Sequence, residues 1–168
     1  MELLHLRERP TQDIDVLGCW DSETMSIACI DRFPEELLAC INRVTGDHPE
    51  LSGMRGGSWV NLGPRALAKA GLPEGCLTRL QPLRIGNRLT LHLLGRQDLI
   101  ALKLYAAADD HDPRQEVHFA DLKAMAPTFD ELDFAVGWLR TRRDFEEKRL
   151  TVKYVLQRLG HDDLAYYV

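Results

Sequence analysis

Two carboxylates stand two residues apart near the start of the chain, within the stretch 9–17. Side chains alternate between the faces of a β-strand, so a strand from Asp13 to about Cys19 would project Asp13 and Asp15 from one face and Ile14 from the other. Like charges on one face repel each other unless a cation lies between them. The motif therefore predicts a site for a hard cation such as Mg²⁺, bound through carboxylates and substrate phosphates.

The same spacing has a simpler interpretation. Asp-Ile-Asp can equally be the polar edge of a strand whose other face is buried. The motif alone does not separate the two interpretations, because many half-buried strands alternate in this way. The elements that surround it must decide.

Length and composition are those of one globular domain. The chain has 168 residues, of which 45% are hydrophobic and 28% charged, enough to bury a core. It contains no apolar run near membrane-spanning length, and its first residues are too charged for a secretory signal. We therefore expect no membrane partner. The four cysteines show neither a Cys-x-x-Cys pair nor a histidine at zinc spacing, which predicts reduced thiols and a cytoplasmic protein.

The charge distribution argues against a broad nucleic-acid-binding surface, because the formal net charge is −5. One local basic cluster stands out near the C-terminus. Its members are Arg140, Arg142, Arg143, Lys148, Arg149 and Lys153. Asp144, Glu146 and Glu147 interrupt it, so we interpret the cluster as the solvated face of a helix.

Turn and cap signals predict the elements that would position the acidic pair. Pro34 followed by two glutamates opens a helix that ends near Gly46. Strands 80–85 and 89–94 flank a Gly-Asn turn. Helices follow at 99–108, 116–125 and 145–159, and Thr128-x-x-Glu131 is a capping box that opens a further one. The predicted class is α/β, of the α+β kind: a small mixed sheet with flanking helices in residues 1–126, and a helical extension, 127–168, packed with this core.

Four stretches carry a resemblance to a known family. They are 9–17, 70–75, 98–107 and 118–122. In this order they resemble the bacterial nucleotidyltransferase-like proteins related to the AbiEii and MenA toxins and to the minimal nucleotidyltransferases. The similarity extends from about Leu3 to Leu159.

The resemblance implies a nucleotide site with defined roles. Asp13 and Asp15 would bind Mg²⁺, Lys103 would contact a nucleoside triphosphate, and Asp121 would complete the catalytic pocket. Such roles suit nucleotidyl transfer, which depends on in-line positioning and charge neutralisation. Taken without the resemblance, Lys103 and Asp121 are ordinary surface residues of amphipathic helices.

Two positions depart from the family's pattern. Family members carry a Gly-Gly or Gly-Ser turn before Asp-x-Asp, where backbone donors cradle the phosphates, but here no glycine precedes Gly18. Either the native start lies upstream of Met1 or half of this phosphate site is missing. We expect Arg9 and Thr11, together with Lys103, to contact the nucleotide. His92 stands on the strand where related transferases often place a third carboxylate. It is a third candidate metal ligand, although imidazole suits magnesium poorly, and it can equally be a hydrogen-bonded strand residue.

Three hypotheses follow from the resemblance. The first is a magnesium-dependent enzyme that transfers a nucleotidyl group to a tRNA, another RNA or a protein, as a toxin with an antitoxin partner or in phage defence. The second is a degenerate member that binds or regulates, through a homodimer that covers an unpaired sheet edge. The third is a nonfunctional remnant.

Overall fold

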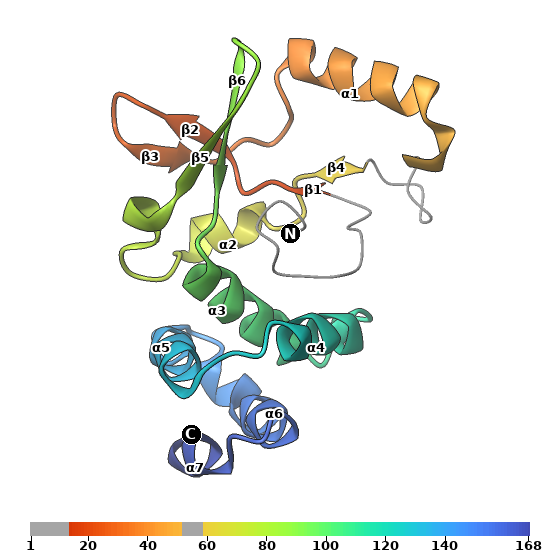
Figure 1. Cartoon of the computed structure of the whole chain (residues 1–168). Helices are drawn as coiled ribbons and strands as arrows, with labels where there is room; N and C mark the ends of the chain where they lie inside the picture. Colours follow the sequence, from red (N-terminus) through yellow and green to blue (C-terminus); the bar gives the residue numbers. More distant parts are fainter. Residues whose placement is uncertain (1–13, 52–58) are drawn as a thin grey trace. The chain divides into compact units, whose positions relative to one another are not determined.

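The computed structural model describes residues 14–51 and 59–168, which form two compact units (Figure 1). The first unit extends to Leu72 and the second from Pro73 to Val168. Helices and short strands occur together, which confirms the predicted α+β class. The strands pair as three two-stranded sheets in these residues. None of the helices described is long and apolar enough to cross a membrane.

Four short strands of the first unit form two pairs. β1 (Ile14–Asp15) pairs in parallel with β4 (Val60–Asn61), and β2 (Cys19–Asp21) pairs antiparallel with β3 (Ser26–Ala28). The strand predicted from 13 to 19 is thus interrupted after β1. Gly18 explains part of the interruption, because a Cβ atom there would lie 2.5 Å from the carbonyl oxygen of Ala28. Only glycine lets the chain approach β3 so closely.

The first unit also contains helix α1 (Glu35–Asp47), a short 3₁₀ helix η2 (Pro49–Leu51) and helix α2 (Arg65–Ala70). The predicted proline and acids begin α1, which continues one residue past Gly46. A side-chain hydrogen bond joins α1 to the residue before β4: Trp59 Nε1 donates to Thr45 Oγ1 at 3.1 Å.

The second unit begins with the 3₁₀ helix η3 (Cys76–Arg79) and an antiparallel hairpin. Its strands, β5 (Gln81–Ile85) and β6 (Leu89–Leu93), pair with Ile85 opposite Leu89. Gly86 turns the chain with a φ of +61°, a left-handed conformation that costs glycine little. The predicted hairpin is confirmed.

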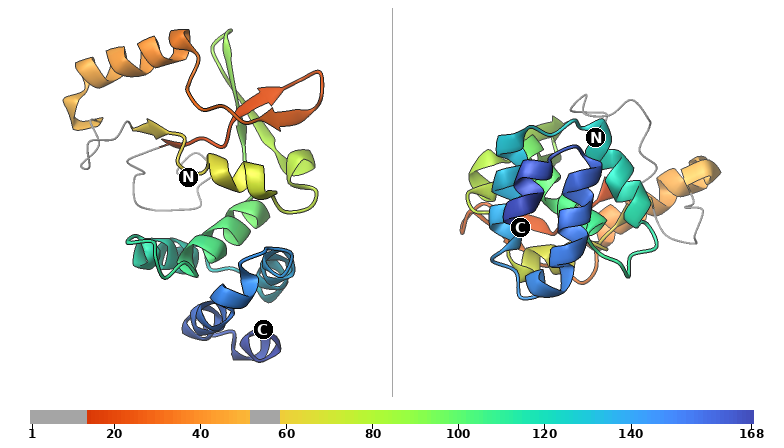
Figure 2. Two further views of the ribbon diagram at one scale, coloured as in Figure 1. Left: turned by 180° about the vertical axis from the view of Figure 1, so that it is seen from behind. Right: turned by 90° about the horizontal axis from the view of Figure 1, so that it is seen from below.

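Five helices complete the second unit: α3 (Arg96–Ala107), α4 (Gln115–Ala124), α5 (Phe129–Leu139), α6 (Phe145–Arg158) and α7 (Asp162–Tyr167). α3 is the central helix, with α4, α5 and α6 packed against it. Ile100, Ala101 and Leu104 of α3 are fully buried. Seen from below, α6 and α7 lie side by side (Figure 2).

The predicted helix boundaries agree with those of the structure to within three residues. Thr128 and Glu131 form the predicted capping box, in which each side chain accepts from the other residue's backbone N–H. α3 begins at Arg96, three residues before the prediction, and α7 was not predicted.

Candidate functional site

Asp15 lies at the carboxyl end of β1, and its side chain is exposed. Its register partner on β4 is Asn61, whose side chain accepts from Gly63 N at 2.9 Å. Paired residues of neighbouring strands project from the same face of a sheet, so a carboxylate and an amide oxygen lie together at this strand end. The predicted residues Arg9, Thr11 and Asp13 lie outside the described residues.

Lys103 and Asp121, the other two residues with predicted central roles, form an ion pair. Lys103 on α3 places its Nζ 2.9 Å from Oδ2 of Asp121 on α4. The aspartate side chain is 3% exposed and the lysine side chain 21%. A carboxylate this deeply buried requires a cation or hydrogen bonds to stay charged. The pair is therefore largely buried, whereas helix periodicity alone predicts surface positions for both residues.

His118 extends this cluster, because it lies one turn before Asp121 on α4. Its Nε2 is 3.1 Å from Oδ2 of Asp112, and its Nδ1 is buried with no hydrogen-bond partner. Burial lowers the pKa of His118, and the positive charge of Lys103 lowers it further, against the opposing effect of Asp112. The imidazole is therefore neutral at physiological pH. Neither His118 nor Asp112 is among the predicted site residues.

The lowered pKa of His118 predicts a loss of stability in acid. As the pH falls through about 6.5, the unfolded histidine takes up a proton and the buried one does not, so the unfolded state is favoured. The free energy of unfolding of the wild type should thus fall between about pH 7.5 and about pH 5.5 by more than that of His118→Gln. Urea titrations at both pH values measure this difference. His111→Gln, at an exposed loop position, should behave as the wild type. An equal pH effect in wild type and His118→Gln would contradict the prediction.

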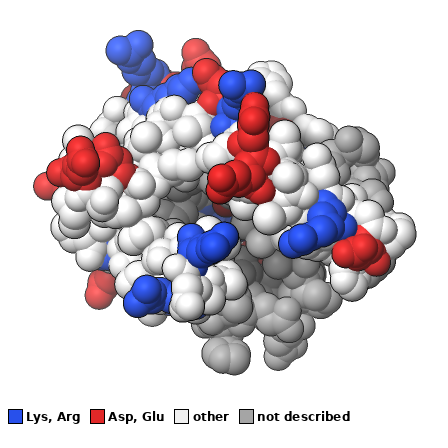
Figure 3. All heavy atoms as spheres, turned by 90° about the horizontal axis from the view of Figure 1, so that it is seen from above, with Lys and Arg blue, Asp and Glu red and all other residues white. Residues whose placement is uncertain are grey.

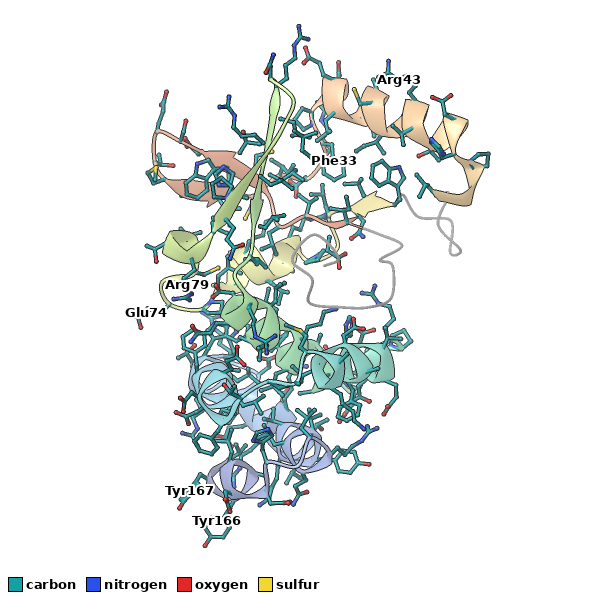
Figure 4. The ribbon with its side chains drawn as sticks, viewed as in Figure 1. Phe33, Arg43, Glu74, Arg79, Tyr166 and Tyr167 are labelled. Carbon is teal, nitrogen blue, oxygen red and sulfur yellow. The ribbon has the colours of Figure 1, made fainter. Side chains whose placement is uncertain are left out.

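A second buried ion pair, which the sequence did not predict, fixes the start of α3. Arg79 donates to both carboxylate oxygens of Asp98, from Nε at 3.0 Å and from Nη2 at 2.7 Å. Nη2 also donates to the carbonyl oxygen of Glu74; Arg79 and Glu74 are labelled in Figure 4. The guanidinium carbon lies 5.2 Å from the ring centroid of Phe134. Burial and Asp98 raise the pKa of the neighbouring Cys76 to about 12, so this thiol stays protonated. The cluster is structural rather than nucleophilic.

His92 lies on β6 in register with Pro82 and is half-buried. Within residues 14–51 and 59–168, no three His, Cys, Asp or Glu side chains gather in a way that could hold a metal. The structure therefore does not join His92 to two further ligands in this part of the chain. Its role as a metal ligand stays a prediction.

At least two of the six members of the basic cluster near the C-terminus form ion pairs with acids in the described residues. Lys148 Nζ lies 3.1 Å from Oδ2 of Asp109, and Arg149 Nη1 lies 3.7 Å from Oε2 of Glu146. Elsewhere, on the face seen from above, basic and acidic side chains of the described residues are interspersed (Figure 3). Arg140, Arg142 and Arg143 lie between α5 and α6 rather than on a helix. The prediction of a solvated helical face therefore fits Arg149, which is 53% exposed, better than Lys148, which is 13% exposed.

Of the predicted site residues, the structure brings Lys103 and Asp121 into contact and places Asp15 at an exposed strand end of the first unit. It adds His118, whose pKa the charge of Lys103 lowers, and Asp112, which contacts His118. A signal for His118 existed, because residues three apart on a helix are neighbours. Comparisons of the chain with protein-family models, with curated proteins and with solved structures found no match.

Proposed function

We propose that this protein is a magnesium-dependent nucleotidyltransferase that transfers a nucleotidyl group from a nucleoside triphosphate to a hydroxyl of an RNA, such as a tRNA, or of a protein. The observation that carries the proposal is the contact between Lys103 and Asp121. These two positions were chosen from motif order alone, 18 residues apart, and their side chains lie 2.9 Å from each other on packed helices.

The available donors suit magnesium. Asp15 offers an exposed carboxylate, and Asn61 offers an oxygen beside it. Hard oxygen ligands of this kind are those that Mg²⁺ takes in phosphate-transfer sites. Asp13 and Asp15 would hold the ion, which when bound neutralises phosphate charge. The four free cysteines fit a cytoplasmic site of action, where nucleoside triphosphates are abundant.

Lys103 and Asp121 would then divide binding and proton transfer between them. The ammonium group has three donors, of which one meets Asp121, so the partly exposed lysine retains donors for a triphosphate. A lysine drawn toward the phosphates would leave an oxygen of Asp121 free to accept a hydrogen bond from the acceptor hydroxyl. Asp121 would accept the proton of the acceptor hydroxyl. The hydroxyl oxygen would then bond to the α-phosphorus of the nucleotide, and the bond from that phosphorus to pyrophosphate would break.

Binding of magnesium and a nucleotide to the folded chain tests the proposal. A ligand that binds only the folded state at 100 times its Kd adds about 2.7 kcal/mol of stability, which raises Tm by roughly 5–10 °C for a chain of this size. We expect this shift with magnesium and at least one nucleoside triphosphate. It should disappear in the double variant Asp13→Ala, Asp15→Ala.

A matched control removes the same charge elsewhere. Asp31 and Asp47 are exposed acids of the same unit, so the double variant Asp31→Ala, Asp47→Ala should keep the full shift. Transfer itself is measured with α-labelled nucleotide and total RNA or protein as acceptor. The absence of any shift with all four nucleotides would overturn the proposal and favour a protein that binds partners without catalysis.

A further inference from the structure

Helix α6 carries apolar side chains on two opposite faces. Phe145, Val152, Val155 and Leu156 face the core and are buried. Leu150 and Tyr154 are 78% and 58% exposed. Successive residues of a helix are 100° apart, which places Leu150 and Tyr154 on the side away from the core. A surface helix normally carries polar residues there.

Leu150 and Tyr154 belong to one row of residues spaced four apart, which we call the α6 row: Glu146, Leu150, Tyr154 and Arg158. Rows of this spacing form the ridges by which helices commonly pack. The acidic end of the row is accessible, because the side chain of Glu146 is 79% exposed and has only a long contact, 3.7 Å, with Arg149 of the same helix. The row has an acid at one end, a base at the other and two apolar residues between them.

The basic end of the row is held in place by α4. Arg158 donates to both carboxylate oxygens of Glu116, at 2.7 and 3.0 Å, and its guanidinium carbon lies 3.7 Å from the ring centroid of Phe119. The Tyr154 ring is 5.6 Å from the same carbon. The arginine side chain still keeps 32% of its surface exposed. A side chain ordered in this way loses little conformational entropy when a partner binds.

We infer that the α6 row is a self-association surface that takes the same row of a second copy of this chain in an antiparallel, two-fold arrangement. Reversed, the row reads Arg-Tyr-Leu-Glu, so Glu146 of each copy faces Arg158 of the other while the leucine and tyrosine side chains pack at the centre. A two-fold interface requires such a self-complementary surface. One pair of crossing helices buries less area than a standard interface, so the dimer is weak, with a Kd of about 10 to 100 µM. This inference is independent of the proposed function.

Sedimentation velocity on the full chain, from about 2 to about 200 µM, tests the dimer. The wild type should shift from monomer to dimer over this range, and Leu150→Glu should weaken association at least tenfold. Leu150→Glu should fold normally, because the side chain it replaces is exposed, and its circular dichroism spectrum checks this. Met25→Glu is the matched control, since Met25 is 64% exposed and lies outside the row. It should dimerise as the wild type does.

The charged ends provide a second test. Glu146→Lys would place a lysine opposite Arg158 of the other copy, so it should weaken association severalfold, and more strongly at low salt. A wild type that stays monomeric at every concentration would overturn the inference and leave the row to a different partner. A dimer equally stable in Leu150→Glu, or lost equally in Met25→Glu, would also overturn it, because association would then not depend on the α6 row.

Discussion

Replacing Arg79 with methionine is expected to lower the free energy of unfolding of the second unit by about 3 to 5 kcal/mol, because it leaves a buried carboxylate without its cation. Asp98 is 0% exposed and accepts two hydrogen bonds from this arginine. Methionine retains much of the aliphatic packing against Phe134 but offers no donor. The carboxylate of Asp98 then stays buried without a positive charge to offset its lost hydration.

The reverse replacement should cost less. Asp98→Ala leaves behind the guanidinium, whose side chain is 31% exposed and can be hydrated, so we expect a loss of about 2 kcal/mol. Urea unfolding followed by far-UV circular dichroism, to which the five helices of the second unit contribute, measures both losses. Asp133→Ala, at an exposed position of α5, should change stability by less than about 0.5 kcal/mol. Equal losses in Arg79→Met and Asp133→Ala would contradict the assignment of a structural role to the pair.

The pair between Arg79 and Asp98 also shows a kind of contact that local sequence patterns do not predict. The hairpin around Gly86 and the cap at Thr128 were predictable because the turn and the cap are formed by residues close together in sequence. Arg79 and Asp98 are 19 residues apart, and nothing in either neighbourhood specifies the other. The helix was predicted to begin at residue 99, whereas Asp98 lies in the first turn of α3, which begins at Arg96.

The candidate site was predictable to the same limited extent. Lys103 and Asp121 were selected by a resemblance that covers the order of several motifs, while helix periodicity favoured surface positions for both. Burial of Asp121 depends on a lysine supplied by another helix, which periodicity cannot indicate. His118 was missed for a related reason, since its partner Asp112 comes from the turn before α4.

A double-mutant cycle on Lys103 and Asp121 should separate the structural role of this pair from its function. We expect Lys103→Met to cost about 2 to 3 kcal/mol of unfolding free energy, because Asp121 then stays buried without the ammonium. Asp121→Asn should cost less, since the lysine is partly exposed and can reach water. With both changes together, the loss should be smaller than the sum by about 1 kcal/mol or more, as for residues in direct contact. Urea unfolding at pH 7 of the four proteins gives the coupling energy.

Nucleotide binding to the same four proteins tests whether Lys103 and Asp121 also act in binding and transfer. If Lys103 binds a triphosphate, Lys103→Met and the double variant both lose the magnesium and nucleotide shift in Tm, whatever their stabilities. Asp121→Asn should keep this shift while losing transfer, because an amide cannot accept the acceptor's proton. Lys123→Met removes a lysine from an exposed position of α4 and should leave both properties unchanged. A full nucleotide shift in Lys103→Met would limit the pair to a structural role, because an ion pair that only joins α3 to α4 has no effect on phosphate binding once the folded state is populated.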